Sequence, residues 1–214
     1  MDGRTEILGA DSKFDSILNQ LRKRRTLSLK IAFPILIGKD IVMGNKPHEL
    51  AISTELSWYA VAGAIFVLAG VWIRLWARGH FAREGLFTTG PYALVRHPLY
   101  LGSLMIVVGV LFQLNGWVNW VIILPLFSLF HGIAIIYEER TLASRFGFIW
   151  SSYASRVPSL VPSLCSLSNT GRSEKWQLGR FLRTHEFFTT VMALSLPVLI
   201  ELLEDVVFEG ILHV

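Results

Sequence analysis

The sequence has very little cysteine and few charged residues for its length. Its 214 residues include one cysteine, Cys165, so no intramolecular disulfide can form. Only 17% of the residues are charged, against about a quarter in an ordinary soluble domain, and 52% are hydrophobic. This composition excludes an intrinsically disordered chain and a disulfide-rich scaffold. Together with a mean hydropathy of +0.49, it indicates an integral membrane protein.

The net charge of +4 is distributed around apolar segments rather than along one basic stretch. Basic clusters such as residues 22–25 flank these segments, which fits anionic lipid headgroups better than nucleic acid. We therefore expect a membrane-embedded protein that acts on lipid or lipophilic molecules and has no nucleic-acid partner.

Long uncharged stretches predict an all-α integral membrane protein with about five transmembrane helices, each needing about 20 apolar residues. The segment 56–73 is the first clear span, and Trp58 and Trp72 near its ends are typical of aromatic belts. Two weaker segments, 27–43 and 187–203, would complete the count. Both are interrupted or bordered by charged residues, so the sequence leaves open whether each one crosses the membrane.

The longest uncharged stretch predicts a helical hairpin, roughly over 98–137, because it is twice the length of one span. The turn dipeptide Asn115-Gly116 breaks it near the middle. In the first arm, Gly102 and Gly109 share one helix face, where small residues let another helix approach closely. Glycines that are merely tolerated would explain this pattern equally well.

The distribution of basic residues predicts the orientation of the chain. If both weak segments span and the N-terminus is cytoplasmic, seventeen of the twenty Lys and Arg residues lie on the cytoplasmic side. The expected parts are then a basic cytoplasmic N-terminus (1–30), a membrane core (31–162), a linker with an interfacial helix (163–186), and a C-terminal membrane segment with an acidic tail (187–214). A cytoplasmic cap would carry the chemistry. A bacterial inner membrane or an endoplasmic reticulum would suit this topology, and the oligomeric state stays open.

Two motifs flank the predicted hairpin. The first, from Gly85 to Gly102, reads GLFTTGPYALVRHPLYLG, and the second, from Glu138 to Pro158, reads EERTLASRFGFIWSSYASRVP. Arg-His-Pro alone at the start of a helix would be an interfacial anchor followed by a proline suited to the first turn. In this order and around a hairpin, the two motifs resemble the isoprenylcysteine carboxyl methyltransferase and phospholipid methyltransferase family of integral membrane enzymes.

This resemblance implies methyl transfer from S-adenosylmethionine to a lipid, lipidated or small apolar acceptor. It implies cofactor contacts in the loop, at the start of the next helix and at one acidic residue: Glu84, Gly85, Leu86, Phe87, Tyr92, His97, Pro98, Leu99, Tyr100 and Glu138. The Glu138 carboxylate suits a cationic group of the cofactor, and His97 at a helix N-terminus suits its anionic end. Glu139, which precedes Arg140, is expected to be a solvated helix end.

His131 lies inside the second arm of the hairpin, where an ionisable side chain is a functional candidate. It is a candidate catalytic residue, as a proton acceptor, although a histidine hydrogen-bonded to a neighbouring helix is the commoner arrangement. The six histidines have no metal-ligand spacing, so no metal site is expected.

Three alternatives to this function stay open. Membrane sterol reductases have a similar helical core and bind NADPH, and a membrane protein could keep the fold without the chemistry. The third is a prenyl-cysteine carboxyl methyltransferase proper. By resemblance, those enzymes have an arginine on the turn before the first glutamate of the second motif, where this sequence has Ala134. This difference predicts an acceptor with a neutral amine, hydroxyl or thiol.

Overall fold

The computed structural model describes residues 57–80, 85–114 and 116–162, together with positions 16, 20, 35, 38–40, 43, 190–192, 194, 195 and 199. Its regular elements are α2 (Trp58–His80), the 3-10 helix η1 (Gly90–Ala93), α3 (Pro98–Gln113), α4 (Trp117–Phe146) and α5 (Phe148–Ala154). The described residues contain no strand. The all-α prediction is therefore confirmed for this part of the chain.

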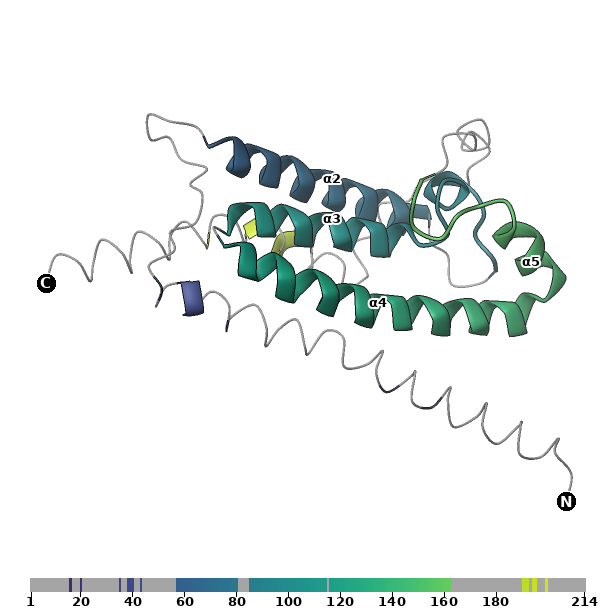
Figure 1. Ribbon diagram of the computed structural model, residues 1–214. Coiled ribbons are helices and arrows are strands. Elements are labelled where there is room, and N and C mark those ends of the chain that lie inside the picture. The colour runs from purple at the N-terminus through teal and green to yellow at the C-terminus, as the bar shows by residue number, and fades with distance from the viewer. Residues whose placement is uncertain are drawn as a thin grey trace, which may run out of the picture.

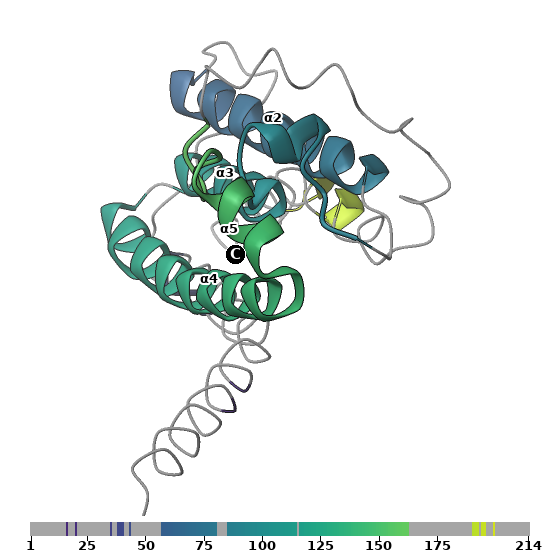
Figure 2. The same ribbon diagram turned by 90° about the vertical axis from the view of Figure 1, so that its right-hand side faces the viewer.

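Helices α2, α3 and α4 lie side by side and alternate in direction (Figure 1). Helices α3 and α4 form the predicted hairpin, and α4 continues past the expected end at residue 137 to Phe146. Pro98 begins α3, where its missing N–H costs no hydrogen bond, and Gly147 with φ +51° ends α4. Viewed from the end of the bundle that carries α5, the loop before α3 lies at that same end (Figure 2).

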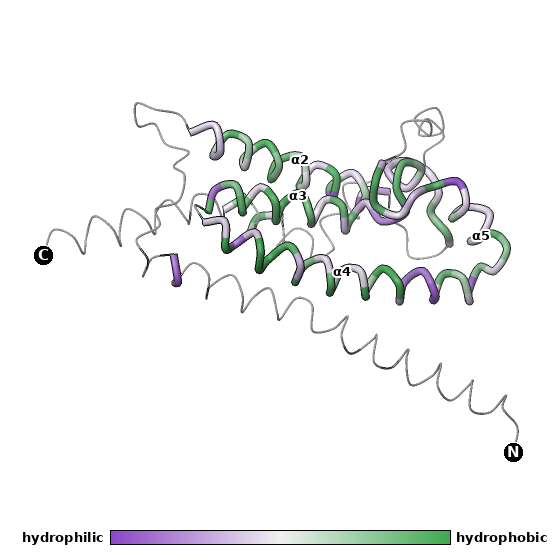
Figure 3. Tube along the Cα trace, in the orientation of Figure 1, coloured by the Kyte–Doolittle hydropathy of each residue, from purple (hydrophilic) through white to green (hydrophobic). Residues whose placement is uncertain are grey.

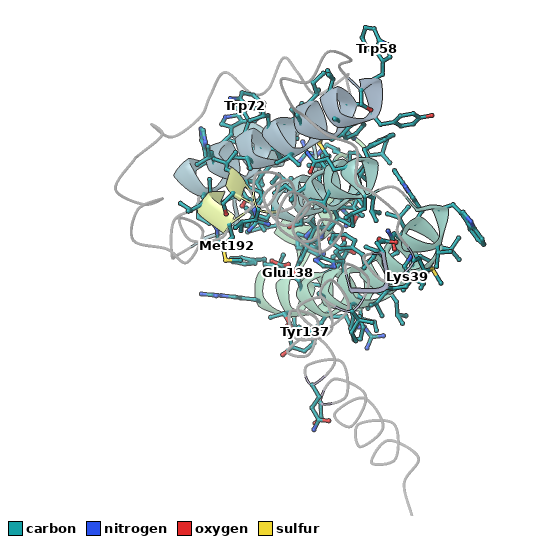
Figure 4. All side chains as sticks on the ribbon, turned by 90° about the vertical axis from the view of Figure 1, so that its left-hand side faces the viewer. Lys39, Trp58, Trp72, Tyr137, Glu138 and Met192 are labelled. Atoms are coloured by element: carbon teal, nitrogen blue, oxygen red, sulfur yellow. The ribbon has the colours of Figure 1, made fainter. Side chains whose placement is uncertain are left out.

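Two helices, α2 and α4, are long and apolar enough to cross a membrane by length and composition, and α3 is a shorter apolar helix. The apolar colouring follows these three helices, while hydrophilic residues recur on α4 towards α5 (Figure 3). Trp58 is 82% exposed and projects outward from α2, as does Trp72 (Figure 4). A protein surrounded by water rarely exposes apolar faces of this extent, so these faces suit a lipid environment.

The remaining expected spans, 27–43 and 187–203, fall largely outside the described residues. The expected N-terminus (1–30), linker and interfacial helix (163–186) and acidic tail also lie there, apart from isolated positions. The count of five spans and the domain boundaries therefore stay predictions.

Helices α2 and α3 pack backbone against backbone through two pairs of glycines. A Cβ atom on Gly63 would lie 2.6 Å from the carbonyl oxygen of Gly109, and one on Gly70 would lie 2.6 Å from that of Gly102. Helices can approach this closely only where both lack side chains. The close approach predicted for Gly102 and Gly109 is confirmed, with α2 as the partner.

We expect Gly102→Ala to destabilise the protein, although alanine is the better helix former by about 1 kcal/mol. The new methyl group would lie 2.6 Å from Arg74 Cγ and 2.7 Å from the carbonyl oxygen of Gly70, which forces α2 and α3 apart. Gly132→Ala on α4 is the matched control, because nothing lies within 4 Å of its added Cβ. Thermal unfolding in detergent should show a lower midpoint for Gly102→Ala only. Equal midpoints for the two variants would contradict the packing argument.

Polar side chains add a further contact between α2 and α3, and another between α4 and residues 39–40. Arg74 of α2 donates to the carbonyl oxygen of Leu99 at 3.3 Å and to the hydroxyl of Ser103, both in α3. At the opposite end of the bundle, Asn119 at the start of α4 donates to Asp40 Oδ2 at 2.6 Å, and Lys39 lies 2.7 Å from the other Asp40 oxygen. These contacts hold residues 39–40 against the end of the bundle that lies away from α5.

Candidate functional site

The loop before α3 is held in a tight turn against the end of α2. Gly90 has φ +61°, and a Cβ there would lie 2.9 Å from the ring of His80, so only glycine fits. The 3-10 helix η1 follows, and it buries Tyr92 with its ring 6.3 Å from that of Phe87. The loop is therefore shaped by close packing as well as by its own sequence.

A cap segment, residues 147–159, closes over this loop. Tyr153 donates its hydroxyl to the carbonyl oxygen of Tyr92 at 2.6 Å, and burial raises the pKa of Tyr153 above its usual range, so it keeps the proton that it donates. The backbone N–H groups of Arg96 and His97 donate to the carbonyl oxygens of residues 158 and 159, at 2.8 and 3.1 Å. The buried cluster of the cap consists of Trp150, Tyr153 and Val157, with Leu86, Leu142, Phe146 and Ala154 packed against it.

His97 lies at the centre of the site, between two consecutive carboxylates of α4. The residue is only 4% exposed. Its Nε2 lies 3.1 Å from Glu139 Oε1, and its Nδ1 lies 3.8 Å from Glu138 Oε2. Arg96 Nη1 lies 2.9 Å from the same Glu139 oxygen. The Arg-His pair of the first motif therefore meets the Glu-Glu pair of the second.

The expectation that Glu139 is a solvated helix end is wrong. Its side chain is 28% exposed, and its Oε1 also accepts a hydrogen bond from Ser159 Oγ at 3.4 Å. The Glu138 side chain, at 46%, is the more exposed of the two. Glu139 was missed because its partners come from the loop before α3 and from the cap, which are distant in sequence.

The site continues into the hairpin through Tyr100 and His131. The Tyr100 ring centre lies 5.7 Å from that of His97 and 5.6 Å from that of His131. His131 is 8% exposed, stacks on Phe127, and its Nδ1 lies 3.0 Å from the carbonyl oxygen of Phe127. Phe127 belongs to the same helix, α4. The ring of Tyr100 therefore lies between His97 and His131, and His131 lies within the apolar part of the bundle.

The residues predicted from the sequence gather at one end of the bundle, from the loop, the start of α3 and α4: Gly85, Leu86, Phe87, Tyr92, His97, Pro98, Leu99, Tyr100, His131 and Glu138. Glu84 lies outside the described residues. Sequence reasoning missed Arg96, Glu139 and Ser159, which lie next to His97, and Trp150, which packs against Arg96. Trp150 lies beneath the Arg96 guanidinium, whose carbon is 5.7 Å from the ring centre. The available signal for the missed ion pair was a basic residue adjacent to His97 in the first motif and an acidic residue adjacent to Glu138 in the second.

The charges of the site are unevenly compensated. Arg96 neutralises Glu139, whereas among the described residues His97 is the one basic side chain within 4 Å of the Glu138 carboxylate. A carboxylate that no guanidinium neutralises attracts a cation or hydrogen-bond donors. The arrangement can therefore hold a ligand that presents an ammonium group or hydroxyls to Glu138. The part of the chain that the structure describes has no group of three His, Cys, Asp or Glu side chains that could hold a metal ion.

Comparison with known proteins gives matches across this part of the chain. Residues 58–148 match the family described as phospholipid methyltransferase. The chain is 28% identical to the nickel-cobalt-cadmium resistance protein NccN of Alcaligenes xylosoxydans xylosoxydans over 177 residues, which are 82% of this chain and 80% of that protein.

Two further relatives match over shorter stretches. The cobalt-zinc-cadmium resistance protein CzcN of Cupriavidus metallidurans is 33% identical over 44% of this chain and 43% of its own length. The protein-S-isoprenylcysteine O-methyltransferase of Schizosaccharomyces pombe is 35% identical over 36% of this chain and 33% of its own length. These matches span less than half of either relative. No solved structure matches the chain.

Proposed function

We propose that the protein is an S-adenosylmethionine-dependent methyltransferase of the membrane, because its residues 58–148 match the phospholipid methyltransferase family. Its acceptor would be a lipid, a lipidated molecule or a small apolar molecule. One observation supports the proposal most strongly. The Arg-His and Glu-Glu pairs, distant in sequence, meet at the end of an apolar hairpin and leave the Glu138 carboxylate available.

The same contacts support specific roles in holding the cofactor. Glu138 would bind the ammonium group, and the start of α3 would face the carboxylate. His97, which the sequence alone assigned to the anionic end, is proposed here for the ammonium instead, because its Nδ1 lies beside Glu138. Aromatic and backbone groups of the loop and of α3 would flank the adenine. The full proposed set is Gly85, Leu86, Phe87, Tyr92, His97, Pro98, Leu99, Tyr100 and Glu138, together with Glu84. When bound, S-adenosylmethionine supplies a methyl group on a sulfonium.

The residues of the chain would contribute mainly alignment and exclusion of water, which methyl transfer needs most. The cap segment packs onto the loop through Trp150 and Tyr153 and keeps this end compact. A neutral acceptor must also lose a proton as it is methylated. His131, buried beside Tyr100 at the inner edge of the site, is the proposed proton acceptor.

The proposed location is a multi-pass membrane protein with its site on the cytoplasmic side, in a bacterial inner membrane or an endoplasmic reticulum. Basic residues at the site end of the described bundle support this orientation: Arg78, Arg96, Arg140, Arg145 and Arg156. Lys39 lies at the opposite end, beside Asn119. Such an asymmetry follows the positive-inside rule.

Binding of the product S-adenosylhomocysteine, compared with NADPH, separates the proposal from its alternatives. We expect the purified protein in detergent to bind S-adenosylhomocysteine saturably, and not to bind NADPH, in a calorimetric titration. Free adenosine, which lacks the ammonium and carboxylate, is the control and should bind at least tenfold more weakly. Binding of NADPH instead would support a reductase. None of the three relatives above has a name that describes a reductase. Binding of neither would favour a non-enzymatic protein that keeps the fold.

The names of NccN and CzcN refer to metal resistance, which raises a second possibility for the biological role. A resistance phenotype does not specify a chemical reaction. Methyl transfer to a membrane component would be compatible with it, and we therefore keep the methyltransferase proposal as the biochemical function.

A further inference from the structure

Three donors from two different segments converge on one oxygen of Glu139. Arg96 Nη1 lies 2.9 Å from Oε1, His97 Nε2 lies 3.1 Å from it, and Ser159 Oγ donates to it at 3.4 Å. Arg96 and His97 belong to the loop before α3, whereas Ser159 belongs to the cap segment. A carboxylate paired with a guanidinium accepts hydrogen bonds and donates none. His97 must therefore present a hydrogen on Nε2 to Glu139.

We propose that Glu139 is a positioning residue that fixes the tautomer of His97. A neutral imidazole has one N–H and one lone pair, so a hydrogen on Nε2 leaves the lone pair on Nδ1. Nδ1 lies 3.8 Å from Glu138 Oε2, a distance too long for a hydrogen bond between them. Glu139 thereby makes Nδ1 an acceptor beside a second acceptor, the Glu138 carboxylate.

This pair of acceptors suits one chemical group in particular, a primary ammonium, which has three donors on a single atom. The inference rests on the proposed function, since that group is the ammonium of S-adenosylmethionine. If His97 carried its hydrogen on Nδ1 instead, an N–H would point at the incoming cation. Glu139 would then control cofactor affinity through His97, with no contact of its own to the cofactor.

A simpler role for Glu139 makes different predictions. The Arg96–Glu139 ion pair, with Arg96 over Trp150, could do no more than fasten the cap to the loop. In that case any loss of charge at residue 139 would be harmful, and an exchange of the two charges would restore function. If the tautomer matters, residue 139 must accept a hydrogen bond, whatever its charge.

Three variants distinguish the two roles by their affinity for S-adenosylhomocysteine. Glu139→Gln keeps an acceptor oxygen, which Arg96 orients because a guanidinium only donates, so we expect its Kd within twofold of the wild-type value. Glu139→Ala removes the acceptor and should raise Kd at least fivefold. The double variant Arg96→Glu with Glu139→Arg restores an ion pair but offers His97 only donors, so it should also raise Kd at least fivefold. Equal losses in Glu139→Gln and Glu139→Ala, or recovery in the double variant, would overturn the proposal.

A second measurement keeps the inference separate from the proposed function. Nitrogen-15 NMR of histidine-labelled protein, with the His97 signals identified by their loss in His97→Ala, should show a hydrogen on Nε2 in the wild type. It should show a changed tautomer balance in Glu139→Ala. A hydrogen on Nδ1 in the wild type would overturn the inference even if the cofactor binds. Failure of the wild-type protein to bind S-adenosylhomocysteine, with the expected tautomer present, would count against the proposed function alone.

Discussion

His97→Ala and Glu138→Gln should each weaken binding of S-adenosylmethionine or its product at least tenfold, which is about 1.4 kcal/mol. Each substitution removes a proposed charge-assisted contact to the cofactor, and such contacts are stronger than hydrogen bonds between neutral groups. His97 is almost fully buried, and Glu138 is the carboxylate of the site that no guanidinium of the described residues neutralises. Calorimetric titration with S-adenosylhomocysteine measures both effects directly.

Glu139→Gln is the matched control for Glu138→Gln, because it makes the same chemical change on the adjacent residue. It should have a much smaller effect, since the Glu139 carboxylate already interacts with Arg96 and His97. An equal loss of affinity in the two glutamine variants would mean that the wrong carboxylate, or the wrong role, has been assigned. Thermal unfolding of each variant separates loss of binding from loss of folded protein.

The hairpin could be predicted from the sequence because its signals are local. An uncharged stretch of twice the length of a span needs a turn, and α3 and α4 end and begin on either side of the predicted one. The sequence also placed Gly102 and Gly109 on one face. It could not name Gly63 and Gly70 as their partners, because which helix packs against that face depends on the arrangement of the bundle.

The sequence predicted which residues belong to the site better than it predicted their contacts. The two motifs identified His97 and Glu138, which the fold brings together at the expected end of the hairpin. Glu139 was misjudged, because a glutamate followed by an arginine in a polar turn has the local pattern of a solvent-exposed ion pair. Its actual partner, Arg96, lies on the far side of the hairpin in the sequence, so only the tertiary structure could reveal the pair.

The chemistry of the methyl acceptor depends on which cations the interior of the site offers. Ala134, one turn before Glu138, is 0% exposed. Two guanidinium groups of the described bundle are already engaged, since Arg74 binds α3 and Arg96 binds Glu139. A carboxylate acceptor brought beside Ala134 would lose its hydration without gaining a guanidinium partner from the described residues, which is costly.

These surroundings predict that the protein does not efficiently methylate the carboxylate of a farnesyl-cysteine. An arginine fork binds a carboxylate through two parallel hydrogen bonds, and the apolar neighbours of Ala134 offer no substitute for it. A lipid or small apolar molecule with a neutral amine, hydroxyl or thiol needs no such partner. It needs a group that takes its proton, and His131 lies one turn before Ala134 in α4, in contact with Tyr100.

The test supplies radiolabelled S-adenosylmethionine together with either N-acetyl-farnesylcysteine or a membrane lipid extract. We expect label in the lipid extract and no base-labile methyl ester on the farnesylcysteine above the rate of the His97→Ala variant. The Schizosaccharomyces pombe relative, a protein-S-isoprenylcysteine O-methyltransferase by name, is the positive control for ester formation. His131→Ala should lower the transfer to lipid while leaving S-adenosylhomocysteine affinity unchanged, because His131 would act on the acceptor and not on the cofactor. Rapid ester formation by this protein would show that a carboxylate can be accommodated without an arginine near Ala134, and would assign it to the prenyl-cysteine branch.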